Sequence, residues 1–148
     1  TPEMINSSIT PLIQDNSIKI TNLMAKMNSI QKHEDPAEVK VVVDKNNFAL
    51  YFSREPIPSR KKGVNEVPML KQVCIIPFLR DFLLEYNDME QTPLEIIESV
   101  DMNRLLENGI KIKMVLTETE TYSVDTIADL ENVNAKMKND LLIKTYIN

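Results

Sequence analysis

The sequence has few of the residues on which several kinds of functional site depend. Its 148 residues include two glycines, one cysteine, one histidine and no tryptophan. Loops that cradle phosphates need glycine where the backbone approaches the ligand, and Gly63 and Gly109 stand far apart. The chain therefore contains neither a Walker-type nor a dinucleotide-type phosphate loop. A single cysteine also excludes an intrachain disulfide and a multi-cysteine metal site.

Other absences indicate in which cellular compartment the protein works and which partners it lacks. The sequence has no signal peptide and no apolar run of the length that spans a membrane, so we expect a cytoplasmic protein with no membrane partner. Its formal net charge of -5 argues against nucleic acid as a partner, because nucleic-acid binders normally present a basic face. The basic cluster at Arg60, Lys61 and Lys62 is too short to reverse this, and we interpret it as a solvated loop.

The lone histidine and the lone cysteine are each expected to have no catalytic role. His33 lies among polar and charged residues, which is typical of a solvated loop. Cys74 lies within an apolar run, which is typical of an inert, buried thiol in a strand.

Helical and strand patterns alternate along the chain. We predict helices that begin near residues 1, 78, 92 and 126, the third of them continuing to about residue 107. Strands are predicted at 18–24, 39–43, 48–52, 69–76 and 110–116, and polar loops at 28–38 and 54–68. The polar residues between the second and third strands are typical of a hairpin turn. Helices that alternate with strands predict an α/β domain with a mixed sheet.

Acidic side chains gather in the predicted helix at 92–107. Helical spacing would place Glu95, Glu98 and Asp101 on one face, where they could meet a ligand. On the residues alone we favour a structural interpretation: Arg104 follows Asp101 by three residues and could pair with it on a solvated face. Glu95 also stands three residues after Thr92, the spacing of a capping box.

Asp125 stands at the end of a polar connection that follows the last predicted strand. Ligands collect at the carboxyl ends of strands in open α/β sheets, and a carboxylate there can bind Mg²⁺. Asp125 could instead cap the helix that begins beside it at Thr126. Spacing alone leaves both interpretations open.

Three segments resemble a known family in the same order along the chain. They are VKVVVDKNNFALYFSREPIP (39–58), TPLEIIESVDMNRLLENGIKIKMV (92–115) and YSVDTIADLENV (122–133). They resemble segments of bacterial 3-deoxy-manno-octulosonate cytidylyltransferases, also called CMP-Kdo synthetases. The segment Thr1–Ile5 resembles the residues that follow the Gln-Gly-Asp-Glu-Pro stretch of that family.

The resemblance implies a nucleotidyltransferase-like fold with a mixed, mostly Rossmann-like sheet and flanking helices, lacking the N-terminal nucleotide-binding strands. Residues 1–148 would then be the C-terminal part of one cytidylyltransferase-like domain. Residues 39–77 would form its hairpin, exposed loop and strand, and residues 92–138 the helices and strand on the sugar and metal side. Such a chain would be inactive by itself, because the nucleotide loop of the family lies in the earlier part.

The activity implied by the resemblance is transfer of CMP from CTP to a 2-keto-3-deoxy sugar acid with release of pyrophosphate. It would serve surface polysaccharide or lipopolysaccharide synthesis, with Mg²⁺ as cofactor, CTP and the sugar acid as ligands, and a homodimer as the assembly. Arg54 would act as the catalytic and substrate-binding arginine that clamps the sugar carboxylate through its planar guanidinium. Asp125 would hold Mg²⁺.

The sequence also departs from the family pattern. Gln72, Ile76 and Phe78 stand where the family commonly has a histidine and two tyrosines, and Met102 replaces a glutamine, while the acids at Glu98 and Asp101 are kept. Loss of polar contacts changes which hydroxyls a site can recognise, so we expect a less hydroxylated or acylated sugar acid, or another activated sugar. The substrate-binding candidates are therefore Arg54, Gln72, Phe78, Glu98 and Asp101.

Two alternatives to a catalyst remain open. The chain could be a catalytically silent module for dimerisation or partner binding, or one half of a split enzyme that a second polypeptide completes. An exposed sheet edge and uncovered apolar surface would favour self-association in either case.

Overall fold

The computed structural model describes residues 1–64, 66–124 and 126–146. Residues 2–118 form one compact unit, and Thr1 together with residues 119–148 forms a second. That all 148 residues belong to a single domain stays a prediction.

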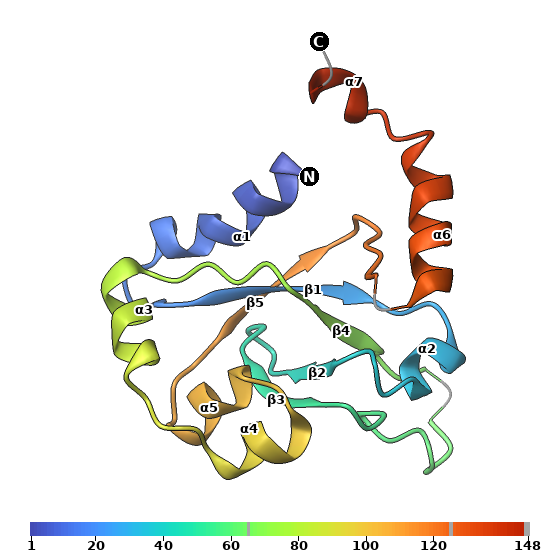
Figure 1. The fold of residues 1–148 in the computed structure, drawn as a ribbon. Coiled ribbons are helices and arrows are strands. Elements are labelled where there is room, and N and C mark those ends of the chain that lie inside the picture. Colours follow the sequence, from blue (N-terminus) through green and yellow to red (C-terminus); the bar gives the residue numbers. More distant parts are fainter. Residues whose placement is uncertain (65, 125, 147–148) are drawn as a thin grey trace. The chain divides into compact units, whose positions relative to one another are not determined.

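A five-stranded sheet organises the first unit (Figure 1). Its order is β3-β2-β4-β1-β5, and only the pair β1 and β5 is parallel, so the sheet is mixed as predicted. The hairpin of β2 and β3 is also confirmed, with Val41 opposite Phe52. The strands are β1 (Thr21–Lys26), β2 (Lys40–Val43), β3 (Ala49–Ser53), β4 (Leu70–Val73) and β5 (Lys113–Thr117).

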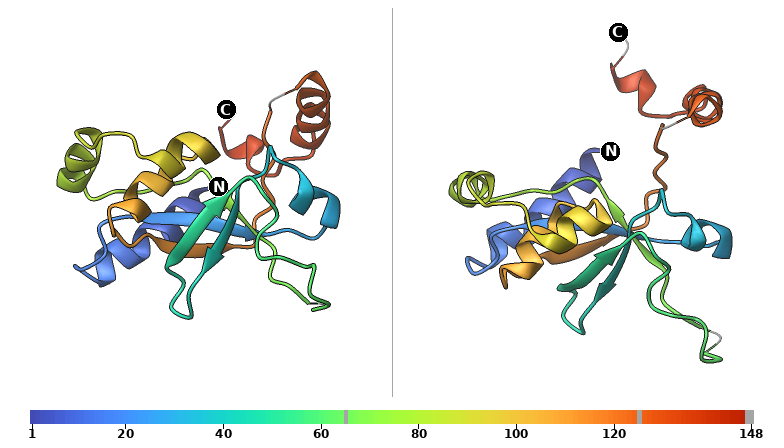
Figure 2. Two further views of the ribbon diagram at one scale, coloured as in Figure 1. Left: turned by 90° about the horizontal axis from the view of Figure 1, so that it is seen from below. Right: turned by 60° about the horizontal axis from the view of Figure 1, so that its bottom comes forward.

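Helices cover both faces of this sheet (Figures 1 and 2). Helix α1 (Pro2–Gln14) lies on one face, where Met4 packs on Leu23, Ala25 and Val73. Helices α3 (Arg80–Asn87), α4 (Pro93–Glu98) and α5 (Met102–Glu107) lie on the other face over a larger core. Neighbouring strand residues point to opposite faces, so β1 sends Leu23 towards α1 and Met24 towards α5. The predicted mixed α/β fold with flanking helices is therefore confirmed.

The polar stretch at 28–38 is not the loop that its composition suggested. It holds a short helix, α2 (Ile30–Glu34), and Lys32 N donates a hydrogen bond to the Ser29 hydroxyl at its start, over 3.4 Å. The helical turn directs His33 inwards, where it is wholly buried and Nε2 donates to the Ile57 carbonyl over 2.9 Å. The expectation of a solvated His33 was wrong, because the polarity of sequence neighbours does not say which side of a helical turn faces the core.

The prediction of a single helix at 92–107 was also wrong. It is interrupted at Ser99, which adopts left-handed backbone angles of φ 52° and ψ 48°. The side chain of Arg54, which is distant in sequence, donates hydrogen bonds to the carbonyls of Glu98 and Ser99 at this break. Side-chain donors thus satisfy carbonyls that the end of α4 leaves free. This interruption separates α4 from α5 and creates a junction, residues 99–101, that the rest of the site uses.

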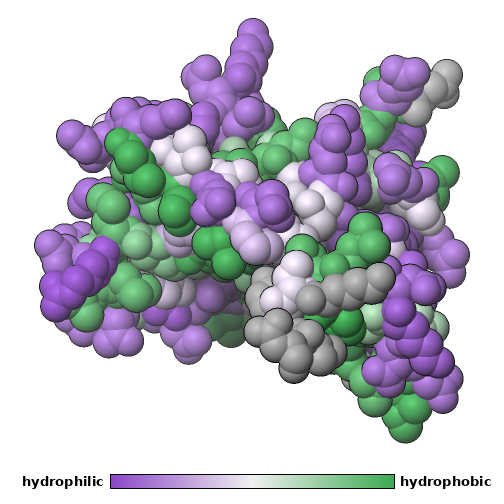
Figure 3. All heavy atoms as spheres, turned by 90° about the horizontal axis from the view of Figure 1, so that it is seen from above, coloured by the Kyte–Doolittle hydropathy of each residue, from purple (hydrophilic) through white to green (hydrophobic). Residues whose placement is uncertain are grey.

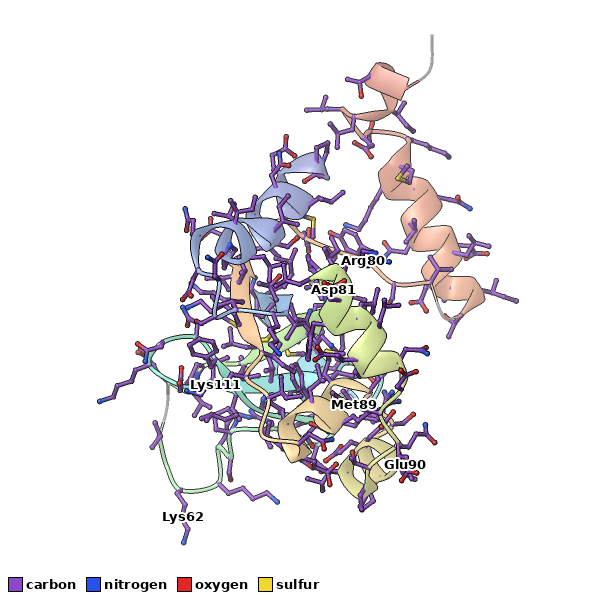
Figure 4. All side chains as sticks on the ribbon, turned by 90° about the vertical axis from the view of Figure 1, so that its left-hand side faces the viewer. Lys62, Arg80, Asp81, Met89, Glu90 and Lys111 are labelled. Atoms are coloured by element: carbon purple, nitrogen blue, oxygen red, sulfur yellow. The ribbon has the colours of Figure 1, made fainter. Side chains whose placement is uncertain are left out.

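The loop after β3 is confirmed as irregular over its described residues, 54–64 and 66–68. Arg60 is anchored by an ion pair with Glu34 of α2, with 2.5 Å between Nη2 and Oε1. Lys61 and Lys62 are exposed, and Figure 4 shows Lys62 directed away from the ribbon at the end of the loop. The expectation of a solvated basic cluster therefore holds for the two lysines, whereas Arg60 is half-buried.

The second unit contains α6 (Ile127–Met137) and α7 (Ile143–Tyr146). The predicted capping box is confirmed: Thr126 N donates to Asp129 Oδ2 over 2.9 Å, and Asp129 N donates to the Thr126 hydroxyl over 3.2 Å. The apolar stripe of α6 is largely exposed, with Ile127 at 79%. Asp125 lies outside the described residues.

Apolar residues also reach the surface of the first unit. Ile5 and Ile13 of α1 are 54% and 75% exposed. Green patches are interspersed with hydrophilic ones on the face drawn in Figure 3. Among the residues that the structure describes, no helix combines the length and apolar character needed to cross a bilayer.

Candidate functional site

Arg54 follows directly after β3 and ties three segments together. Its Nε donates to the Glu98 carbonyl over 2.8 Å, Nη1 to the Pro36 carbonyl over 2.9 Å and Nη2 to the Ser99 carbonyl over 3.2 Å. A guanidinium has five N–H groups, so these three bonds leave two, one on each terminal nitrogen. Arg54 thus holds the α4–α5 junction in place and keeps donors for a further acceptor.

The carboxylate of Glu98 is fully engaged within the protein. Its Oε1 accepts from the Tyr51 hydroxyl over 3.0 Å and from the Ser53 hydroxyl over 2.8 Å, and Oε2 accepts from Arg54 N over 2.8 Å. Burial opposes the charged form, but these hydrogen bonds outweigh it and hold the pKa of Glu98 below its usual value. For Tyr51, burial and the bond to Glu98 raise the pKa.

Lys40 is a site neighbour that sequence reasoning missed. Its side chain is wholly buried, and Nζ donates to the carbonyls of Asp35 over 2.9 Å, Glu38 over 2.7 Å and Arg54. Burial lowers the pKa of Lys40. Lys40 and Arg54 together fix the turn at 35–38 against the end of β3. The only signal in the sequence is a lysine beside three valines of an apolar strand.

Gln72 lies in β4 and pairs with Met24 of β1. The Met24 side chain belongs to the core covered by α4 and α5, so Gln72 faces that side of the sheet. Gln72 Nε2 donates to Asn22 Oδ1 over 2.7 Å.

Asp101 lies at the α4–α5 junction and is exposed. It borders a hollow of about 420 Å³ that is also lined by Gln91, Glu95, Ile96, Ser99 and Val100. Burial raises the pKa of Tyr86, and the charge of Asp101 raises it further, so Asp101 acts electrostatically on Tyr86 of α3. Arg54, through its bonds to the Glu98 and Ser99 carbonyls, and Asp101 thus both lie at the junction.

The ion pair expected between Arg104 and Asp101 is not formed. Arg104 instead binds Glu95, with 2.7 Å from Nε to Oε2 and 2.5 Å from Nη2 to Oε1. The break at Ser99 folds α5 back against α4 and brings these two residues together. Arg104 Nη1 also donates to the carbonyl of Met89, labelled in Figure 4, over 3.2 Å. Hydrogen bonds from Arg104 lower the pKa of Glu95, in opposition to burial.

Phe78 stands apart from the other substrate-binding candidates. It pairs with Ile20 at the start of β1, whereas Gln72 pairs with Met24. Four residues along a strand correspond to about 13 Å. The Phe78 ring packs against Phe82 and Tyr86 of α3, with ring centres 6.1 and 5.4 Å away.

Cys74 corrects another expectation. Because β4 ends at Val73, Cys74 falls outside the strand, and it is exposed rather than buried. In the part of the chain that the structure describes, no three His, Cys, Asp or Glu side chains gather as metal ligands. Asp125 lies outside the described residues, so its assignment as an Mg²⁺ ligand stays a prediction.

The structure thus brings together Arg54, Glu98 and Asp101 around the α4–α5 junction and places Gln72 on the face of the sheet that α4 and α5 cover. A protein-family model described as Cytidylyltransferase matches residues 1–112. The chain belongs to the cytidylyltransferase family. The resemblance inferred from the three sequence segments is confirmed.

Individual relatives agree with this assignment. The chain is 43% identical over 131 residues to the 3-deoxy-manno-octulosonate cytidylyltransferase of Fusobacterium nucleatum, covering 88% of this chain and 53% of that protein. It is 38% identical to the enzyme of the same name from Geobacter metallireducens, covering 92% and 58%. A solved structure of CMP:2-keto-3-deoxy-manno-octonic acid synthetase complexed with CTP matches with a TM-score of 0.87 and 32% identity, covering 95% and 57%. The chain spans little more than half the length of these relatives.

Proposed function

We propose that the chain forms the sugar-acid side of a cytidylyltransferase that transfers CMP from CTP to a 2-keto-3-deoxy sugar acid and releases pyrophosphate. The observation that carries this proposal is the likeness to proteins of that name, which extends over 88% of the chain or more in the relatives described above. Supply of a CMP-sugar for surface polysaccharide or lipopolysaccharide would be the role of the whole protein.

Within this proposal Arg54 binds the substrate carboxylate. Its two remaining N–H groups, one on each terminal nitrogen, suit the two oxygens of a carboxylate, and the three carbonyl bonds hold the guanidinium in a fixed orientation. The carboxylate of Glu98 is occupied by Tyr51, Ser53 and the Arg54 backbone, so Glu98 acts by positioning Arg54. Asp101 is free to accept from a sugar hydroxyl, whereas Phe78 packs against α3 away from these residues and has no ligand contact in this proposal.

Mg²⁺, when bound, would neutralise charge on the triphosphate of CTP. Asp125 remains the proposed ligand, and none of the roles assigned to Arg54, Glu98 or Asp101 depends on the metal.

The carboxylate role of Arg54 is tested with a sugar acid and its C1 amide, using the natural polypeptide that carries this chain. We expect Arg54→Lys to lower kcat/KM for the acid by at least tenfold, because a lysine cannot offer two parallel donors. Arg80→Lys serves as the control, since Arg80 is an exposed arginine paired only with Asp81 in the described residues. Equal kcat/KM for the acid in Arg54→Lys and wild type, with both proteins folded, would contradict the role.

A second candidate function is assembly rather than catalysis. Exposed apolar side chains on α1 (Ile5, Ile13) and on α6 (Ile127, Leu130) favour it, because such surfaces commonly contact another chain. A homodimer or a complementary half of a split enzyme would cover them. Pyrophosphate release by the chain of 148 residues alone would oppose this candidate, whereas concentration-dependent dimerisation in analytical ultracentrifugation without such release would favour it.

A further inference from the structure

Asn22 is a buried amide whose orientation the backbone fixes. It lies in β1, is wholly buried, and its Nδ2 donates to the carbonyls of Val73 over 2.7 Å and Leu23 over 3.1 Å. A third carbonyl, that of Ile75, lies 3.4 Å away. Carbonyl oxygens only accept hydrogen bonds, so the nitrogen of the Asn22 amide must face them. Its oxygen is thereby directed to the opposite side.

The fixed oxygen of Asn22 in turn sets the orientation of Gln72. Asn22 Oδ1 can only accept, so the Gln72 amide must present its nitrogen to it, over 2.7 Å. Gln72 Oε1 consequently points away from Asn22. Gln72 is half-buried, and within the described residues its Oε1 is not among the buried polar atoms that lack a partner. The Gln72 oxygen is therefore an accessible acceptor whose orientation is held by a chain of two amides.

The neighbourhood of this acceptor is that of the proposed substrate site. Gln72 pairs with Met24, which belongs to the larger core, so it faces the side of the sheet covered by α4 and α5. Arg54 supplies donors at the α4–α5 junction, whereas Gln72 supplies an oriented acceptor on this side of the sheet. A ligand with a carboxylate at one end and a hydroxyl at the other would satisfy both.

We infer that Asn22 and Gln72 form a specificity-determining pair, in which Asn22 positions Gln72 so that its Oε1 accepts a hydrogen bond from one hydroxyl of the sugar acid. This inference rests on the proposed function for its ligand class. It also makes the expected change of substrate more specific. The positions of Ile76 and Phe78 are apolar, while the position of Gln72 still requires a donor from the ligand. An acetylated or deoxygenated sugar at that hydroxyl would be disfavoured.

Amide exchange in solution tests the orientation without any activity. In ¹H–¹⁵N spectra of the 148-residue chain, we expect one Gln72 side-chain amide proton to be shifted and protected from exchange through its bond to Asn22. Asn22→Ala should abolish that protection, whereas Gln31→Met, which changes an exposed glutamine in α2, should leave it intact. Free exchange of both Gln72 amide protons in the wild type would overturn the orientation.

Substrate discrimination tests the ligand class in the natural polypeptide that carries this chain. The substrates are a sugar acid and analogues that each lack one of its hydroxyls. We expect kcat/KM for one analogue to be about 3- to 10-fold lower than for the parent, which corresponds to the loss of one neutral hydrogen bond. Gln72→Met should abolish that discrimination, Asn22→Ala should weaken it, and Gln31→Met should preserve it. Unchanged discrimination in Gln72→Met would overturn the inference while leaving the proposed function standing. Failure of the wild type to use any sugar acid would overturn both the proposed function and this ligand class, whatever the exchange data show.

Discussion

At the residue scale, Glu98 is an acid whose carboxylate is held by hydrogen bonds from within the protein. Three donors surround its carboxylate and lower its pKa, so the charged form stabilises the folded state. A lowered pKa in the folded state means that this stabilisation is complete above the ordinary glutamate pKa and is lost as the pH falls through the lowered value.

We therefore expect Glu98→Gln to lower the free energy of unfolding by about 1–3 kcal/mol at pH 7, because an amide nitrogen would face a donor. The difference from wild type should shrink as the pH falls below the usual pKa of a glutamate. Urea unfolding at a series of pH values measures this. A difference that stays constant down to acidic pH would contradict the charged role of Glu98.

Arg54 is expected to have a structural role in addition to its proposed catalytic one. Arg54→Ala removes donors from three backbone carbonyls, those of Glu98 and Ser99 at the α4–α5 junction and that of Pro36 in the turn at 35–38. We expect a loss of about 2–4 kcal/mol in the free energy of unfolding, from several hydrogen bonds of about 1 kcal/mol each. Denaturant titration beside Arg80→Ala provides the comparison. An Arg54→Ala protein as stable as Arg80→Ala would mean that the carbonyl contacts contribute nothing.

At the scale of elements, the α4–α5 pair depends on one largely buried ion pair. The side chains of Arg104 and Glu95 are only 14% and 6% exposed. Removing one partner leaves the other charge buried, and such single changes typically cost about 3–5 kcal/mol. We expect the loss of free energy of unfolding in Arg104→Met to fall in this range. In the double variant Glu95→Gln with Arg104→Met, part of the loss should be recovered, because no buried charge remains unpaired. Strictly additive losses in this double-mutant cycle would argue against the pairing.

Ser99 offers a test of the break between these helices. It holds a left-handed backbone conformation that glycine adopts without the steric penalty of a Cβ. Ser99→Gly should raise the free energy of unfolding by about 0.5–1 kcal/mol, while Ser99→Val should lower it by more. Thermal and urea unfolding measure both changes. Destabilisation by glycine would indicate that the serine side chain, rather than its backbone, defines the junction.

The sequence could predict elements better than their junctions. Capping residues, the hairpin turn and apolar alternation located most helices and strands, because these signals are local. The break at Ser99 depends on donors from Arg54, which lies 45 residues away in sequence, and no local pattern contains it. Burial of His33 and exposure of Cys74 were missed for the same reason, since each depends on where the chain packs.

At the scale of the whole molecule, the resemblance singled out Arg54, Glu98 and Asp101 as candidates, but it did not point to the polar residues that hold the neighbouring backbone and side chains in place. Lys40 and Asn22 are polar residues within strands, and only the fold reveals that their partners are backbone carbonyls. The likeness to cytidylyltransferases establishes the family, whereas the sugar-binding residues and the Mg²⁺ ligand Asp125 stay proposals.

The most direct test of the central claim is pyrophosphate release with CTP, Mg²⁺ and a panel of 2-keto-3-deoxy sugar acids. The assay uses the natural polypeptide that carries this chain, with Arg54→Lys and Arg80→Lys measured in parallel. We expect CTP-dependent release with at least one sugar acid, greatly reduced by Arg54→Lys and unaffected by Arg80→Lys. No release with any sugar acid from a folded protein would contradict the account, and would leave the fold as a scaffold for binding or assembly.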